Sequence, residues 1–368
     1  MHNPYLQELQ IPDVKIRDLR KYNHLNDSII GEVGNTAFDF ISEHVDTDDE
    51  KTLVTVANSM FNIDSLSDNY FKAIVNLKRI NDIHKINEYL ECVNEKLPAK
   101  GILIGSVETK TARKNRILRK YPVVLGHIYY AFDFILKRIF PKLPVTRKIY
   151  FKITAGRNRV LSKTETMGRL YCCGFHVIEE KLIGNRLYFV AKKVKEPSYD
   201  DENSYGPIYR MKRYGKDGKI ITVYKIRTMH AFAEYLQEYV YQKNSLKEGG
   251  KFKNDFRVST IGKFFRKYWL DELPMLINLL KGDVKLVGVR PLSKQYLSLY
   301  TEELIQKRFK HKPGLIPPFY ADLPKTLEEI MASEMRYFEQ YEKAPFRTDV
   351  KYFLKICFNI VFRNARSN

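Results

Sequence analysis

The chain has 368 residues, which is enough for two domains, and 44% of them are hydrophobic, which is enough for a buried core. It carries 63 lysines and arginines against 43 acidic residues, a formal net charge of +20 at pH 7. This excess favours a polyanionic partner: an acidic membrane surface, phosphorylated substrates or nucleic acid. Charge by itself does not choose among the three.

Composition argues against a secreted or membrane-spanning protein. The first residues, Met1 to Tyr5, are neither basic nor followed by an apolar core, so we expect no secretory signal peptide. No uninterrupted apolar run reaches about 20 residues, so we expect no bilayer-crossing helix. The four cysteines show no metal-ligand spacing, and a reduced, cytoplasmic compartment fits them best.

Residues 28–110 alternate apolar, strand-like runs with helical segments. Strands are expected at 52–56, 73–77 and 101–107, with a helix over 86–97. Such alternation predicts an α/β fold with βαβ units on a parallel sheet. The segment 71–104 resembles the second half of a class I methyltransferase sheet, and the runs within 161–191 resemble its closing strands. This resemblance implies a Rossmann-like α/β domain over residues 1–195.

A working methyltransferase needs a glycine-rich turn after its first strand, where the backbone approaches the cofactor closely. The nearest candidate runs from Ile30 to Asn35 and holds only Gly31 and Gly34. That is a weak match to the fingerprint. We therefore expect a degenerate methyltransferase-like scaffold without a cofactor.

Residues 123–140 are rich in aromatic and aliphatic side chains and end near Lys137 and Arg138, with more basic residues following. This composition suits a helix that lies in the headgroup region of a membrane. A helix packed on its own domain with a solvated basic flank explains it equally well. The apolar C-terminal segment 352–363 leaves the same two alternatives open.

A polar, acidic, proline-bearing stretch at 196–204 reads as a linker, and the sequence changes character after it. We expect a second domain over 205–368. The glycine-containing turn at 214–219, between two strand-like runs, predicts a hairpin that leads into the segment 225–229.

The most informative segment is 266–283, where Asp271 and Glu272 stand side by side after a basic flank, at the opening of an apolar helix. Neighbouring carboxylates repel each other, and they stay ionised together only if a cation, a metal ion or helix-terminal N–H groups compensate them. This arrangement indicates phosphoryl chemistry. Acids that simply favour a helix N-terminus are the alternative.

Several motifs occur here in the order and at the spacing of the bacterial sugar transferases, the monotopic polyprenyl-phosphate phosphoglycosyl transferases. They are Gly206-Pro207, Lys225–Met229, Ile261–Lys267, Leu270–Pro274 and Val287–Pro291. The chain resembles that family over residues 205–316, which implies an α+β catalytic domain. A helix N-terminus alone does not account for the flanking motifs.

The resemblance implies a transfer of sugar-1-phosphate from a nucleotide diphosphate sugar, such as a UDP-sugar, to a polyprenyl phosphate, such as undecaprenyl phosphate. The reaction passes through an aspartyl-phosphosugar intermediate, uses magnesium and serves polysaccharide biosynthesis. By motif position Asp271 is the expected nucleophile. Glu272 is expected to hold the metal ion or to handle a proton.

Basic side chains in these motifs are candidates for gripping phosphate. Arg227 and Arg290 come first, because a guanidinium matches phosphate oxygens bidentately and stays charged. Lys225, Arg266 and Arg308 are weaker candidates of the same kind. For each of them a surface salt bridge is the alternative.

Asp283 follows a glycine, and it is either a second metal ligand or only a turn residue. The segment after Pro313–Ile316 departs from the family pattern, so the sequence does not name the sugar.

The chain departs from the family at one important place. Family members enter the catalytic region from an apolar re-entrant membrane helix, and here the acidic linker precedes Gly206-Pro207. We expect peripheral attachment to the inner face of the bacterial cell membrane through 123–140, the C-terminal helix, the basic surface or a partner. A non-catalytic scaffold or regulator of a membrane glycan-assembly pathway is the alternative function. No nucleic-acid motif is recognised, so nucleic acid is not expected, and a homo-oligomer is left open.

Overall fold

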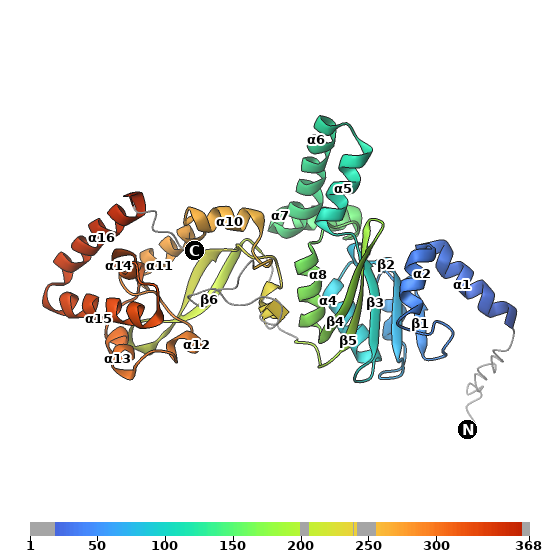
Figure 1. The fold of residues 1–368 in the computed structure, drawn as a ribbon, viewed down its shortest axis with the longest axis horizontal. Coiled ribbons are helices and arrows are strands. Elements are labelled where there is room, and N and C mark those ends of the chain that lie inside the picture. The colour runs from blue at the N-terminus through green and yellow to red at the C-terminus, as the bar shows by residue number, and fades with distance from the viewer. Residues whose placement is uncertain (1–18, 199–205, 238, 241–254, 363–368) are drawn as a thin grey trace, which may run out of the picture.

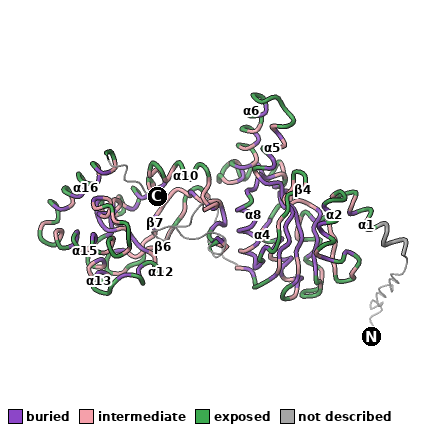
Figure 2. The backbone as a smooth tube through the Cα atoms, viewed as in Figure 1, coloured by how far each residue is buried: buried purple, intermediate pink, exposed green. Residues whose placement is uncertain are grey.

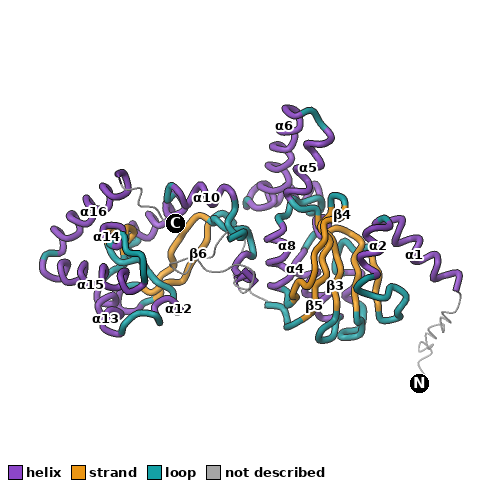
Figure 3. The backbone as a smooth tube through the Cα atoms, in the orientation of Figure 1, coloured by secondary structure: helices purple, strands orange, loops and turns teal. Residues whose placement is uncertain are grey.

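The computed structural model describes residues 19–198, 206–237, 239–240 and 255–362. A five-stranded sheet with its helices occupies one end of an elongated molecule, and a group of C-terminal helices occupies the other (Figure 1). A long two-stranded hairpin lies between them (Figure 3).

The large sheet has the strand order β1-β2-β3-β5-β4. β1 (Thr52–Thr55), β2 (Ala73–Arg79) and β3 (Ile102–Val107) run parallel, and the hairpin of β4 (Phe175–Ile183) and β5 (Arg186–Lys193) joins them antiparallel. β2 is buried over its first five residues, as expected of a central strand covered on both faces. The prediction of a mixed α/β fold with parallel strands is confirmed.

Helices cover both faces of this sheet. On one face α1 (Leu19–Val33) and α2 (Asn35–Ser42) bury Ile29 and Phe40 against Val75. On the other face α3 (Phe61–Asp64), α4 (Ile86–Lys96) and α8 (Lys163–Cys172) pack against Ile74 and its neighbours. Ile74 and Val75 face opposite cores because side chains alternate along a strand.

The candidate glycine turn at Ile30–Asn35 lies at a junction between two helices. Gly31 is inside α1, and Gly34, with φ of 84°, is the N-cap of α2. A cofactor turn of the methyltransferase kind follows a strand instead. The two glycines therefore serve the helix junction.

A helical excursion leaves the sheet after β3. It consists of α5 (Lys110–Lys120), α6 (Val123–Phe134), a π-helical turn (Ile135–Ile139), a 3-10 turn (Phe140–Lys142) and α7 (Pro144–Thr154). The predicted helix over 123–140 is thus present. In Figure 1 the pair α5 and α6 stands away from the sheet.

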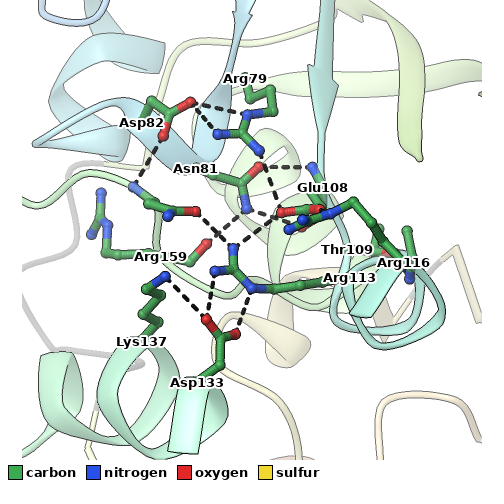
Figure 4. A network of polar contacts seen from close by, with 12 residues as sticks. Arg79, Asn81, Asp82, Glu108, Thr109, Arg113, Arg116, Asp133, Lys137 and Arg159 are labelled. Carbon is green, nitrogen blue, oxygen red and sulfur yellow. Dashed lines mark hydrogen bonds and ion pairs between the residues drawn. The ribbon is translucent and has the colours of Figure 1, made fainter. Parts of the chain in front are cut away.

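A buried network of ion pairs fixes this excursion to the carboxyl ends of β2 and β3 (Figure 4). Arg113 on α5 donates from Nε to Asp133 Oδ2 at 2.6 Å and from Nη1 to Glu108 Oε2 at 3.1 Å. Glu108, directly after β3, also accepts from Arg79 Nη1 of β2 at 3.3 Å. Since each buried charge has partners, the network holds α5 and α6 in one orientation.

The expected linker begins against the first half of the chain. Ser198 N donates to Cys172 O at 2.8 Å, and residues 199–204 lie outside the described residues. Part of the second half returns to the first core, where Leu236 is fully buried. A Cβ at Gly168 of α8 would lie 2.2 Å from Phe232 O, so only glycine admits this contact. The domain bounds 1–195 and 205–368 stay a prediction.

The second half is built on the hairpin of β6 (Ile208–Tyr214) and β7 (Ile220–Ile226), which confirms the predicted turn at 214–219. A short parallel pair, β8 (Lys285–Val287) and β9 (Gly314–Ile316), lies beyond it. The remaining helices are α10 (Thr260–Lys267), α11 (Leu276–Leu280), α12 (Lys294–Leu297), α13 (Glu302–Lys310), α14 (Phe319–Asp322), α15 (Leu327–Lys343) and α16 (Pro345–Phe362).

A third core joins α13, α15 and α16 through Leu304, Tyr337 and Ile356. Figure 2 shows the buried stretches of these helices facing one another and their outer faces exposed. Within the described part of the chain, no helix combines the length and the apolarity needed to cross a membrane.

Candidate functional site

Asp271 and Glu272 lie on a 3-10 helix, η6 (Leu270–Met275), that follows α10 after a sharp turn. Trp269 makes this turn with φ of 56°, a left-handed conformation that a bulky side chain rarely adopts. The expected apolar helix starts only at Leu276, as the five-residue α11. The two acids therefore lie in the first turn of a helical segment that begins as a 3-10 helix and continues directly into α11, as predicted.

Cations compensate Glu272. Its Oε1 accepts from Lys225 Nζ of β7 at 2.5 Å and lies 3.6 Å from Arg290 Nη2. Lys225 is nearly enclosed, with 12% of its side chain exposed, whereas 42% of the Arg290 side chain is exposed. Burial and the charge of Arg290 lower the pKa of Lys225, and Glu272 opposes them. Arg290, the more exposed of the two cations, is therefore available to an incoming anion.

Asp271 is buried and incompletely hydrogen-bonded. It is 9% exposed, and among the described residues no donor forms a hydrogen bond with its buried Oδ1. Burial raises the pKa of Asp271 and Glu272 adds to this, while Lys225 and Arg266 lower it. A buried carboxylate oxygen without a donor is costly, and such groups concentrate where chemistry uses them. Asp271 thus presents one oxygen that is ready for another partner.

Two further arginines line the exit of β7. Arg266, in the last turn of α10, donates from Nε to Thr228 Oγ1 at 2.9 Å. Arg227 donates from Nε to Gly206 O at 2.9 Å, and its guanidinium lies 4.9 Å from the centre of the Tyr209 ring. Burial lowers the pKa of both arginines. The structure therefore brings the Gly206-Pro207 motif to the segment 225–229.

The motif glycines mark close backbone approaches. A Cβ at Gly262 would lie 1.9 Å from Thr228 O, and one at Gly314 would lie 2.2 Å from Gly288 N. Only glycine lets α10 rest on the exit of β7 and lets β9 pass the loop that carries Arg290. These contacts explain why glycines stand within the motifs 261–267 and 287–291.

Asp283 lies apart from the two acids. It follows Gly282, which has φ of 73°, and its Oδ2 accepts from Asn278 Nδ2 at 3.1 Å. Asn278 is fully buried, donates to Thr222 O at 2.7 Å and accepts from Tyr224 N at 3.1 Å. Asn278 fixes α11 to β7, and the sequence analysis missed it. The one signal of Asn278 in the sequence is that it is a polar residue within the apolar run 276–280.

Arg308 is also apart from the carboxylates. It is buried, pairs with Glu334 of α15 and donates to the backbone oxygen of Arg290. In the part of the chain that the structure describes, neither Arg308 nor Asp283 forms a hydrogen bond or ion pair with Asp271 or Glu272. In this arrangement Arg308 positions the loop of Arg290, and its predicted phosphate contact stays untested.

Among the described residues, no three His, Cys, Asp or Glu side chains gather as a ready set of metal ligands. Magnesium usually keeps several waters and is held by one or two carboxylates together with substrate phosphates. Glu272, whose pairs with Lys225 and Arg290 both engage Oε1, fits that mode beside Asp271. Glu272 and Asp283 as metal ligands stay predictions.

An apolar cavity of about 180 Å³ opens beside Glu272. Its walls come from η6, α11, β9, α14 and the end of α16, and among the described residues that line it Glu272 alone is charged. The lining side chains are Trp269, Leu273, Leu276, Leu315, Ile316, Pro317, Tyr320 and Ile360. A hydrocarbon chain that ends in an anionic group fits this combination of apolar walls and nearby cations.

Comparisons with known proteins point to one family. Residues 200–363 match the family model described as "Bacterial sugar transferase". Undecaprenyl-phosphate galactose phosphotransferase of Salmonella typhimurium is 38% identical over 116 residues, 30% of this chain and 24% of that protein. UDP-glucose:undecaprenyl-phosphate glucose-1-phosphate transferase of Klebsiella pneumoniae is 39% identical over 139 residues, 36% of this chain and 26% of that protein.

An uncharacterized sugar transferase of Bacillus subtilis, EpsL, is 39% identical over 107 residues, 29% of this chain and 46% of that protein. The chain thus spans less than half the length of each of these relatives. Among solved structures, a SAM-dependent methyltransferase of Thermotoga maritima matches 35% of this chain and 58% of that chain at 15% identity, with a TM-score of 0.23. Residues 200–363 of the chain are thus similar to the bacterial sugar transferases.

Proposed function

We propose that this chain is a phosphoglycosyl transferase of polysaccharide biosynthesis. It transfers a sugar-1-phosphate from a UDP-sugar to a polyprenyl phosphate, through an aspartyl-phosphosugar intermediate on Asp271. The observation that carries the proposal is the buried, unpartnered Oδ1 of Asp271 beside the compensated Glu272, within the sugar transferase region. The named activities of the relatives support it.

In the first step Asp271 Oδ1 attacks the phosphorus that bears the sugar. A bond forms between the carboxylate oxygen and phosphorus, the bond to the bridging oxygen breaks, and UMP leaves with that electron pair. Lys225, Arg266 and Arg290 surround the carboxylates with positive charge that offsets the repulsion between an anionic nucleophile and a diphosphate. Arg227 is a further candidate for the nucleotide phosphates.

In the second step an oxygen of the polyprenyl phosphate attacks the same phosphorus, and the Asp271 carboxylate leaves. The product is a polyprenyl diphosphate sugar. The apolar cavity beside Glu272 accommodates the first isoprene units and leaves the phosphate near Arg290. Magnesium, held by Glu272 with substrate phosphates, would supply charge neutralisation on the diphosphate.

We further propose that residues 1–195 form a Rossmann-like domain related to class I methyltransferases and that 205–368 form the catalytic domain. Three parallel strands followed by an antiparallel hairpin support the first part. We place the protein at the inner face of the bacterial membrane, because its acceptor is a lipid.

Release of UMP tests the proposed function. Purified chain is incubated with undecaprenyl phosphate in detergent, magnesium and a panel of UDP-sugars. We expect the wild type and Asp217→Asn to release UMP with one sugar and Asp271→Asn to release none, because Asp217 is an exposed acid of the β6–β7 turn. Undiminished release by Asp271→Asn contradicts the proposal. If none of the three proteins releases UMP, the result favours the alternative of a non-catalytic scaffold.

A further inference from the structure

α6 turns a charged side chain toward the protein and its apolar side chains toward solvent, the reverse of a usual amphipathic helix. Its inward face carries Gly126 and Asp133, and Asp133 is buried in the ion pair with Arg113. Its outward face is apolar and open to solvent. A helix at the surface of a water-soluble protein normally turns its apolar stripe toward the core.

The apolar face is long and continuous. From 123 to 139, nine aliphatic or aromatic side chains are exposed, and Val123 is 73% exposed. They are Val123, Val124, Leu125, Ile128, Tyr129, Phe132, Ile135, Leu136 and Ile139. α7 adds Val145, Ile149 and Ile153 at a spacing of four residues, and Ile153 is 77% exposed. Contiguous apolar surface of this kind marks an interaction site.

Charge identifies the partner. Residues 110–157 contain thirteen lysines and arginines and a single acidic residue, Asp133. Because Asp133 is buried, the charges that this excursion shows to solvent are basic. Arg119 and Lys120 lie at the C-terminal end of α5, just before α6 begins. Lys148 and Lys152 alternate with the apolar residues of α7. Apolar side chains bordered by lysine and arginine fit a bilayer with anionic headgroups.

We propose that α6 and α7 dock on an anionic lipid bilayer by inserting their outward apolar faces at the boundary between headgroups and acyl chains. The network of Arg113, Glu108 and Asp133 holds α6 in one orientation relative to the sheet (Figure 4). This docking surface stands on its own observations and does not depend on transferase activity. It deepens the proposed function by bringing the chain to the membrane that holds a lipid acceptor.

Vesicle flotation of the full chain tests this proposal. We expect binding to vesicles of phosphatidylcholine with about one-third phosphatidylglycerol, and weak binding to phosphatidylcholine alone. The triple variant Val124→Ser, Ile128→Ser, Phe132→Ser should bind at least about a hundredfold more weakly, since each exposed apolar side chain contributes to insertion. Lys148→Ser with Lys152→Ser should cost about fivefold for each lysine.

A matched control carries the same loss of apolar surface elsewhere. Val56→Ser, Phe61→Ser, Leu182→Ser changes three exposed side chains of the first half of the chain and should bind like the wild type. Equal binding of the α6 triple variant and this control overturns the proposal. So does loss of a dimer in the α6 triple variant without any loss of vesicle binding, because the face would then join two copies.

Depth provides a second readout that does not depend on affinity. A tryptophan introduced as Phe132→Trp should be quenched by brominated phospholipid in anionic vesicles. Phe61→Trp, on α3 and outside the segment from α5 to α7, should show no quenching beyond that of the wild type, which contains one tryptophan. Equal quenching of the two variants contradicts insertion of α6.

Discussion

Replacing Gly262 by alanine should loosen the candidate site without touching any charged residue. The added Cβ would lie 1.9 Å from Thr228 O, 2.7 Å from its carbonyl carbon and 2.8 Å from its Cα. All three are backbone atoms, so α10 must move away from the exit of β7 by more than about 1 Å to reach ordinary contact. Such overpacking costs about 3 kcal/mol, and the shift separates Arg266 Nε from Thr228 Oγ1, which are 2.9 Å apart.

The single tryptophan makes this change easy to follow. Trp269 lies two residues beyond α10, so its fluorescence reports unfolding of the site region. A loss of 3 kcal/mol corresponds to a midpoint lower by roughly 6–12 °C for a unit of 150–250 residues. UMP release should fall with it, because Arg266 belongs to the positive surroundings of Asp271.

Gly31→Ala is the matched control. Gly31 lies within α1, and a Cβ there meets no atom within 4 Å. Alanine should leave the Trp269 midpoint unchanged and favour the helix by about 0.5–1 kcal/mol. A Gly262→Ala protein with the wild-type midpoint and activity would refute the close approach of α10 to β7.

Four further outcomes follow from the geometry of the site. Lys225→Met should move the acidic limb of the pH–rate profile to higher pH, because the charge of Lys225 lowers the pKa of Asp271, which must be ionised to attack; an unmoved limb contradicts this. Arg290→Ala should raise the KM for the UDP-sugar with little effect on stability, whereas Arg308→Met should cost about 3–5 kcal/mol by stranding a buried carboxylate, as denaturation will show. Leu276→Asn, in the apolar cavity, should raise the KM for polyprenyl phosphate alone, and equal changes in both KM values would sink the assignment of that cavity.

The elements with local signals could be predicted from the sequence. The runs at 52–56, 73–77 and 101–107 are strands because apolar and β-branched residues fill them between turn residues. The hairpin at 214–219 follows from its glycines. The adjacent acids and the basic side chains in ordered motifs also indicated where the candidate site lies.

The features that the sequence did not reveal depend on contacts between residues that are far apart in the chain. Arg308 pairs with Glu334 and donates to the backbone oxygen of Arg290, and no local pattern in the sequence indicates these two contacts. The left-handed turn at Trp269 separates α10 from η6, and a tryptophan gives no local signal of such a conformation. The return of Leu236 to the first core is likewise invisible in a sequence whose acidic linker suggests separation.

The central claim is a covalent bond between Asp271 and a phosphosugar, and mass spectrometry of the digested chain tests it most directly. The chain is incubated with magnesium and its UDP-sugar in the absence of polyprenyl phosphate, and then digested. The account predicts a gain of one sugar phosphate on the peptide that contains Asp271, absent from Asp271→Asn and discharged when polyprenyl phosphate is added. Transfer that proceeds without any adduct on this peptide would contradict it.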